Sequence, residues 1–180
     1  FTISHWVKTN DLNDTQYLWH KSENGNNHLT LALVYHATNY LSVRYSHTGN
    51  QWGFERNYEK AFENTNHWYH ISFVKNGSNY SVYIDGKEYL SGQFINSNQV
   101  GSSEPFYIGY DGTTSSNGLL GTMDDFQIWN KALTQSEIID YSHRTLTGSE
   151  ADLEAYYRFD QTSGTDGSSI LYDRTGNGHD

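Results

Sequence analysis

The chain has 180 residues, of which 16% are aromatic and 18% are charged, a combination that argues against a disordered chain. The net charge is −10 without any basic stripe, so we expect no nucleic acid partner. No run of about 18 apolar residues occurs, so we expect no membrane insertion. Cysteine is absent, so we expect no disulfides, no thiolate nucleophiles and no cysteine-based zinc sites.

Apolar and polar residues alternate with a period of two along most of the chain, the pattern typical of half-buried β-strands. The first third of the chain predicts strands at residues 1–9, 15–21, 29–37 and 40–46. The last two of these strands form a predicted hairpin. The residues that follow, 46–60, predict a loop.

The strand predicted at residues 67–77 is apolar on both faces, which indicates a central position in a sheet, with Trp68 in the core. It forms a predicted hairpin with residues 80–86. The dipeptide Asp85-Gly86 then predicts a type I′ turn into the next strand, because both positions of that turn require a positive φ.

Four more strands follow the same alternation. They are predicted at residues 87–94, 105–110, 121–130 and 153–159. In the third of them, uninterrupted alternation puts Phe126 and Ile128 on one face of the strand. The same alternation puts Met123 and Trp129 on the opposite face.

One helix is predicted at residues 133–144, where Thr134 and Glu137 form a capping box and Ile138 and Ile139 face inward. Many short strands with one short helix predict an all-β fold, a two-sheet antiparallel sandwich. We expect residues 1–180 to form a single domain. Its last part, 153–180, would supply a closing strand and a polar loop, shared in one alternative with a neighbouring repeat.

Several stretches that occur in order carry a family resemblance. They are FTISHWVKT, HWYHISFVKNG with YSVYIDGK, YIGY, GTMDDFQIWNKALTQSEI and LEAYYRFD. Together they resemble a laminin-G-like domain of the concanavalin A-like lectin/glucanase superfamily. The resemblance covers nearly the whole chain, and its most specific part is residues 121–138. It implies a jelly-roll sandwich of the kind common in secreted bacterial proteins.

The resemblance also implies a function. We expect a non-catalytic, lectin-like carbohydrate-binding module of a larger secreted or cell-surface bacterial protein, with covalently linked neighbouring domains and a glycan or glycoprotein as partner. The chain starts within a predicted strand at Phe1, which suggests a piece of a longer protein. Two alternatives stay open: a structural or protein–protein adhesion repeat without a sugar site, and a glycoside hydrolase of the glucanase type.

The sequence gives only weak support for a catalytic or a zinc-binding site. Glu150, Asp152 and Glu154 resemble by their spacing the catalytic strand of laminarinase-type glucanases. They stand in a predicted loop before the terminal strand, so we expect no catalytic pair. His67 and His70 would point to opposite faces of a strand, which argues against zinc.

Calcium is a stronger expectation, as a structural ion. The glycine-rich segments FDQTSGTDG and YDRTGNGHD offer carboxylates and carbonyl oxygens, the ligands that calcium prefers. The resemblance points to Asp160, Asp173 and Asn177, with Asp125 close in space. The alternative is that these segments are turns in which Asn-Gly adopts a positive φ.

For the glycan, the densest group of candidates is NQWGFERNY, with Trp52, Phe54, Arg56, Asn57 and Tyr58. In a loop these aromatic side chains would be available to stack on sugar rings, although core packing is an equal alternative. Tyr110 and Asp111 would line the rim of the site. Tyr35, Tyr40 and Tyr45 could form an aromatic platform on a concave sheet, but ordinary strand packing is the favoured interpretation of each.

Overall fold

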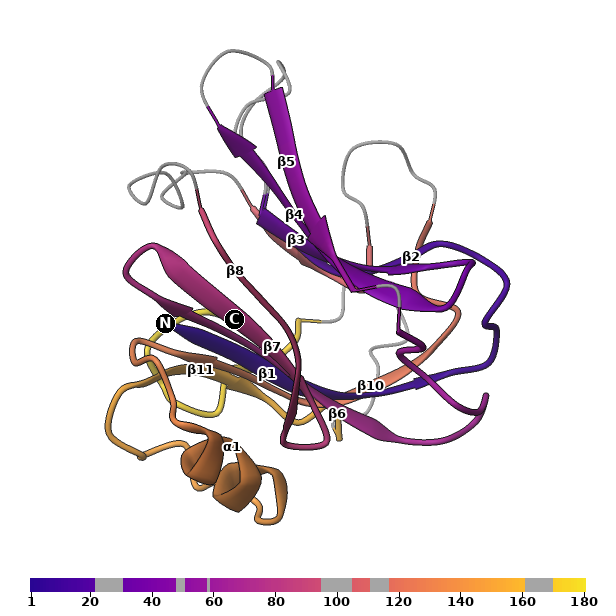
Figure 1. The fold of residues 1–180 in the computed structure, drawn as a ribbon. Coiled ribbons are helices and arrows are strands. Elements are labelled where there is room, and N and C mark those ends of the chain that lie inside the picture. The colour runs from indigo at the N-terminus through magenta and orange to yellow at the C-terminus, as the bar shows by residue number, and fades with distance from the viewer. Residues whose placement is uncertain (22–30, 48–50, 58, 95–104, 111–116, 161–169) are drawn as a thin grey trace.

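The computed structural model describes residues 1–21, 31–47, 51–57, 59–94, 105–110, 117–160 and 170–180, with the backbone alone for 46–47 and 51–56. Two antiparallel sheets lie face to face, and one short helix packs below the lower sheet (Figure 1). The strands are β1 Thr2–Thr9, β2 Gln16–Lys21, β3 Leu31–His36, β4 Tyr40–His47, β5 Gln51–Arg56, β6 Tyr69–Asn76, β7 Asn79–Ile84, β8 Lys87–Gln93, β9 Phe106–Ile108, β10 Gly121–Trp129 and β11 Leu153–Tyr157. This arrangement confirms the predicted all-β sandwich.

The order of strands within each sheet is set by pairing between distant parts of the chain. The six-stranded sheet has the order β11-β10-β1-β6-β7-β8, and the five-stranded sheet has the order β5-β4-β3-β2-β9. Strand β6 lies between β1 and β7, as its two apolar faces predict. In the described residues, no helix has the length and apolar character needed to cross a membrane.

Aromatic side chains from both sheets fill the space between them. The ring of Trp19, from the five-stranded sheet, lies 5.4 Å from that of Phe73 in the opposite sheet. Phe62 joins the sheets a second time, because its ring stacks on Tyr35 at 5.1 Å and on Tyr69 at 4.7 Å. All five residues are buried, so this aromatic layer is the centre of the core.

A second, smaller core lies on the outer face of the six-stranded sheet, under helix α1 (Gln135–Ser142). The predicted capping box is present, and Ile138 is buried as predicted. The prediction that Ile139 also faces inward is wrong, because it is 43% exposed. Its side chain instead covers Gly86, where a β-carbon would lie 2.6 Å from the Ile139 Cγ1 atom. The ring of Tyr141 stacks on Trp129 at 4.5 Å. The helix therefore covers one end of this face and leaves the other end open.

The hairpin between β7 and β8 has the predicted turn, with φ of 49° at Asp85 and 75° at Gly86.

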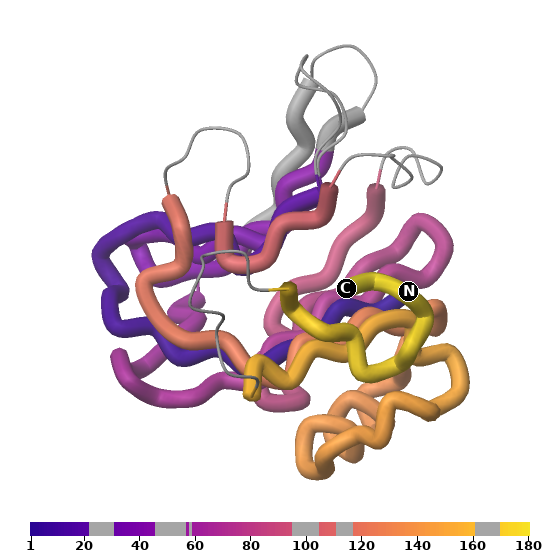
Figure 2. The backbone as a smooth tube through the Cα atoms, turned by 180° about the vertical axis from the view of Figure 1, so that it is seen from behind, coloured from indigo at the N-terminus to yellow at the C-terminus, as the bar shows by residue number. Residues whose placement is uncertain are grey.

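The chain after β11 folds back beside β11 (Figure 2). The backbone N–H of Arg174 there donates to the carbonyl of Tyr156 at 2.8 Å. Strand β11 itself pairs with β10, so a strand forms within the predicted range 153–159.

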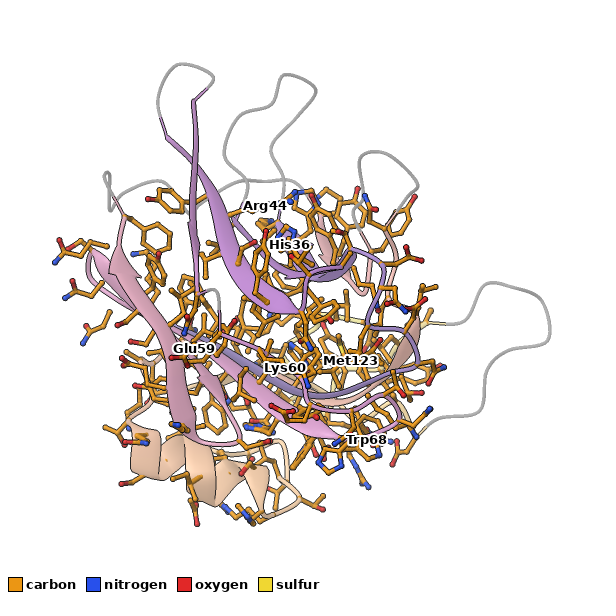
Figure 3. All side chains as sticks on the ribbon, turned by 45° about the vertical axis from the view of Figure 1, so that its right-hand side comes forward. His36, Arg44, Glu59, Lys60, Trp68 and Met123 are labelled. Carbon is orange, nitrogen blue, oxygen red and sulfur yellow. The ribbon has the colours of Figure 1, made fainter. Side chains whose placement is uncertain are left out.

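Two predictions from the sequence are wrong. Residues 51–56 are not part of a loop, because they form β5 and pair with β4 along its length. Trp68 does not lie in the core, because it precedes β6 and is only half-buried. Figure 3 shows Trp68 at the outside of the lower sheet, whereas Met123 lies between the sheets.

The predicted faces of β10 are also wrong in part. Met123 and Phe126 both face the central core, although they are three residues apart. The cause is a β-bulge: the register with β1 shifts between Ser4 and Trp6, and Asp125 adopts a φ of 47°. Uninterrupted alternation could not reveal this extra residue.

The hydroxyl of Tyr89 in β8 connects the two sheets. It donates to the carbonyls of Asn57 at 3.0 Å and Glu59 at 2.7 Å, and it accepts from the backbone N–H of Leu41 at 3.3 Å. Loss of this hydroxyl in Tyr89→Phe should lower the free energy of unfolding by about 1–3 kcal/mol, because it leaves backbone groups without their partner. Chemical denaturation measures this change. Tyr141→Phe, which keeps its ring stack, is the control, and equal stability of the two variants would contradict the prediction.

His5 lies at an inward position of β1 and stacks on Phe126 at 5.4 Å. Neither ring nitrogen has a hydrogen-bond partner among the described residues, and burial, helped by nearby His70, lowers the pKa of His5 to about 3. The unfolded chain, with a histidine pKa of about 6.5, binds this proton more readily. The stabilisation is therefore complete above about pH 6.5 and is lost as the pH falls toward the folded pKa.

His5→Phe should remove this pH dependence. We expect the slope of unfolding free energy against pH to decrease by about 1.4 kcal/mol per pH unit between about pH 6 and pH 4. Denaturant titrations of both proteins across that range measure the slope. Parallel curves for the two proteins would contradict the assignment of His5 as a buried neutral imidazole.

Candidate functional site

The outer face of the five-stranded sheet carries the larger set of polar aromatic side chains. Alternate residues of β2, β3 and β4 face the core, so their neighbours face outward. Ala32, Val34 and Ser42 are small, fully buried residues at the middle of this outer face. Larger polar and aromatic side chains surround them.

Four of these side chains form a row along β2 and β9, which we call the aromatic row. Its members are Tyr110, Tyr107, His20 and Tyr17. The ring centres of Tyr110 and Tyr107 are 6.2 Å apart, those of Tyr107 and His20 are 6.1 Å apart, and those of His20 and Tyr17 are 5.6 Å apart. His20 is buried at 3% exposure, whereas Tyr17, Tyr107 and Tyr110 are partly exposed, so the three tyrosines offer ring faces and polar edges to one extended ligand.

Arg44 of β4 extends the aromatic row toward the centre of the sheet. Its guanidinium donates to the Tyr17 hydroxyl at 2.8 Å and lies 5.6 Å from the centre of that ring. Further along β3 and β4, His36 stacks on Tyr40 at 4.4 Å and forms a 2.7 Å hydrogen bond with the Ser42 hydroxyl. Figure 3 labels His36 and Arg44 on the upper sheet, and the strand pairing places them four residues apart, because Arg44 is opposite Ala32 and His36 is opposite Tyr40. These bonds hold flat groups in fixed orientations.

The sequence analysis missed most of this surface, including Tyr17, His20, Arg44 and Tyr107. Their alternation with core residues was visible, but alternation alone does not say which face of a strand is outside. Of the proposed tyrosine platform, Tyr40 does lie on this outer face.

The other two members of that platform, Tyr35 and Tyr45, lie in the core, at 1% and 6% exposure. The favoured interpretation, strand packing, is therefore confirmed for these two residues.

The predicted sugar-binding residues lie at both edges of this same sheet. At one edge, β5 pairs with β4, so that Phe54 stands opposite Arg44 and Arg56 opposite Ser42 along the backbone. The side chains of Trp52, Phe54 and Arg56, and the whole of Tyr58 and Asp111, lie outside the described residues. At the other edge, Tyr110 belongs to the aromatic row.

Asn57 has a structural role in addition to any contact with a ligand. Its amide donates to the carbonyl of Tyr89 at 2.6 Å, and its side-chain oxygen accepts from the backbone of Glu59 at 3.0 Å. Both groups of the amide are therefore engaged at the end of β5.

The four predicted calcium ligands all take part in hydrogen bonds within the protein. Asp160 pairs with Arg174 at 2.8 Å and with Arg158 at 3.2 Å. Asp125 accepts a 2.5 Å hydrogen bond from the Tyr156 hydroxyl, and the amide of Asn177 donates to the carbonyl of Glu154 at 2.9 Å. Bonds from protein donors thus occupy carboxylate oxygens of Asp160 and Asp125 that a calcium ion would need, whereas Asn177 acts as a donor.

Asp173 shows the same behaviour. Its carboxylate accepts from the backbone of Tyr156 at 3.0 Å and from the hydroxyl of Thr175 at 2.6 Å. Burial acts to raise the pKa of Asp173, but these donors outweigh burial and the pKa is lowered overall. Across the described residues, no cluster of three or more His, Cys, Asp or Glu is arranged to hold a metal ion. As they lie, these residues do not fit a calcium site, so calcium remains an expectation from the sequence that the structure does not support.

The residues weighed above as catalytic or zinc-binding candidates mostly bond to other groups of the protein. Glu150 accepts from the backbone N–H groups of Thr147 at 2.9 Å and Gly148 at 3.0 Å, so it caps a turn. Glu154 forms an exposed ion pair with His179 at 2.9 Å. His70 is buried and forms a 3.0 Å hydrogen bond with Ser4, and His67 is exposed.

The fold is a two-sheet antiparallel β-sandwich of the concanavalin A-like kind. Residues 1–139 match the family model of the concanavalin A-like lectin/glucanases superfamily, and the chain belongs to this family. No curated protein matches the chain.

Solved structures share the fold. A putative carbohydrate-binding protein from Bacteroides ovatus is 19% identical with a TM-score of 0.75, and the match covers 98% of this chain and 49% of that one. This chain thus spans about half of that protein. Domain 4 of AbnA, an extracellular arabinanase from Geobacillus stearothermophilus in complex with arabinotriose, is 22% identical with a TM-score of 0.62, covering 77% of this chain and 64% of that one. The Ruminococcus gnavus IT-sialidase CBM40 bound to α2,3 sialyllactose is 15% identical with a TM-score of 0.62, covering 77% and 80%.

Chelation tests the calcium prediction directly. Because the carboxylates of Asp160 and Asp173 already accept from protein donors, we expect EDTA to leave the melting temperature unchanged. Differential scanning calorimetry with added calcium and with EDTA measures this. A higher melting temperature in calcium that is abolished by Asp173→Asn would restore the calcium site.

Proposed function

We propose that this chain is a non-catalytic carbohydrate-binding module that holds its glycan on the outer face of the five-stranded sheet. The observation that carries the proposal is the aromatic row with Arg44 beside it. Flat rings can stack on the faces of sugar rings, while the arginine, histidine and tyrosine edges exchange hydrogen bonds with hydroxyl groups. In the described residues, no helix covers this face, because α1 packs on the other sheet.

The predicted residues at the sheet edges extend the proposed site. Tyr110 lies at one end, and Trp52, Phe54 and Arg56 belong to β5 at the other. A glycan that crosses the sheet from β9 to β5 would pass over Tyr17 and Arg44. The proposed ligand is therefore an oligosaccharide of several units, and the oligosaccharide-bound similar structures support this class of ligand.

The same comparisons support a binding role, because two of these structures are in complex with oligosaccharides and a third is described as a putative carbohydrate-binding protein. We propose that the module belongs to a larger secreted or cell-surface protein, with linked neighbouring domains.

A glucanase would release reducing sugar from a β-glucan and lose that activity in Glu150→Gln. We expect no release from either protein.

Arg44→Met tests the site. Loss of a charged hydrogen-bond donor should weaken glycan affinity by about 1–3 kcal/mol while the fold is kept, because the side chain is at the surface. A glycan array first identifies the ligand, and isothermal titration calorimetry then compares the affinities of the two proteins.

The matched control is Lys87→Met, which removes one exposed positive charge from the opposite sheet and should leave the affinity unchanged. If no glycan binds to the parent protein, the proposal fails and the adhesion repeat is favoured. Equal binding by the parent protein and Arg44→Met would show that the glycan binds elsewhere than on this face.

A further inference from the structure

A separate cavity, shallow and largely open to solvent, lies on the outer face of the six-stranded sheet. It has a volume of about 320 Å³ and is lined by Trp6, Trp68, Asp124 and Asp125. Trp6 of β1 stands directly across from Asp124 of β10, and Trp68 lies just before β6. Figure 3 shows Trp68 on the side of the sandwich opposite to the aromatic row's neighbour Arg44. This cavity is therefore distinct from the proposed glycan site.

The bulge in β10 explains why two consecutive carboxylates reach one cavity. On a regular strand, neighbouring side chains point to opposite faces. Here Asp125 has a φ of 47°, and the next residue, Phe126, returns to the core. The backbone N–H of Asp125 donates to the carboxylate of Asp124 at 2.8 Å, and the Tyr156 hydroxyl holds Asp125 at 2.5 Å. The two carboxylates are thus fixed in place.

These carboxylates have no ion-pair partner among the described residues, in contrast to Asp160, which has two arginines. A ligand with positive charge would offset the cost of keeping two carboxylates together.

The indole rings favour the same kind of ligand. The ammonium group of Lys8 already lies 4.9 Å from the centre of the Trp68 ring, a cation–π contact within the protein itself. The cavity offers a second indole, Trp6, whose ring meets His70 edge-on at 5.2 Å. In the described residues, the lining contains no cationic side chain, so the walls consist of aromatic surface and negative charge.

We propose that this cavity binds an organic cation of the alkylammonium class. The ammonium group would contact the indole faces of Trp6 and Trp68, and its charge would be compensated by Asp124 and Asp125. Both a small amine and a lysine side chain of another protein carry this chemistry. A neutral sugar can stack on the indoles and donate its hydroxyl hydrogens to the carboxylates, but it leaves their negative charge uncompensated.

The test uses choline as the probe and the indole N–H signals of the five tryptophans as the readout. The Trp6→Phe and Trp68→Phe variants identify two of these signals. We expect choline to shift those two signals with a dissociation constant of roughly 1–10 mM. Salt should weaken the binding, because an ion pair is screened. No shift of either signal would overturn the proposal.

Two controls separate charge from shape. The uncharged carbon analogue of choline, with a tert-butyl group in place of trimethylammonium, should bind roughly tenfold more weakly. Asp124→Asn should weaken choline binding by a similar factor, because its oxygen can still accept from Asp125 while its charge is lost. Asp14→Asn, an exposed residue elsewhere, makes the same change in net charge and should have no effect. Equal binding of choline and its neutral analogue would overturn the proposal.

A further variant and a further probe complete the test. Lys8→Gln removes the competing ammonium group from Trp68 and should strengthen choline binding. Nα-acetyl-lysine amide should shift the same two indole signals if the cavity accepts a lysine side chain, and choline alone should do so if it accepts only a small quaternary amine. Shifts with glucose or arabinose at the same two indoles, equal to those with choline, would instead assign the cavity to neutral sugars.

Discussion

The aromatic layer between the two sheets is the constraint on which both candidate sites depend. Trp19 and Phe73 are buried because their rings face one another across the sandwich. Because side chains alternate along a strand, burial of these rings sends their neighbours outward, and a slip of one residue would exchange the two sets. Tyr17 on one sheet and Trp6 on the other are exposed to ligands for this reason.

His5 shows how strong this constraint is. An imidazole gains nothing from the core, where its nitrogens lack partners among the described residues, yet it occupies an inward position of β1. Its neighbour Trp6 is correspondingly turned outward, although a large indole would suit the core. The strand accepts an unfavourable residue inside because its register is fixed by Ile3 and Val7, which are both buried.

Each candidate site lies beside an interruption of the alternation. In β2 the register with β3 shifts between Tyr17 and Trp19, and in β10 it shifts at Asp125. Each bulge adds one residue, which turns the following side chains to the opposite face. The aromatic row and the two-carboxylate cavity both use side chains redirected in this way. Bulges thus place groups that a regular strand would separate.

The sequence by itself determined the local features: the strands, the type I′ turn at Asp85, the capping box of α1 and the family. These depend on residues close together in the chain, whose φ preferences and periodicity are visible in the letters. Only the tertiary structure decided that β5 joins a sheet, that Trp68 lies outside the core and that Asp125 is a bulge. The reason is that pairing of β1 with β10 joins residues more than 110 positions apart, and no local pattern encodes which strands become neighbours.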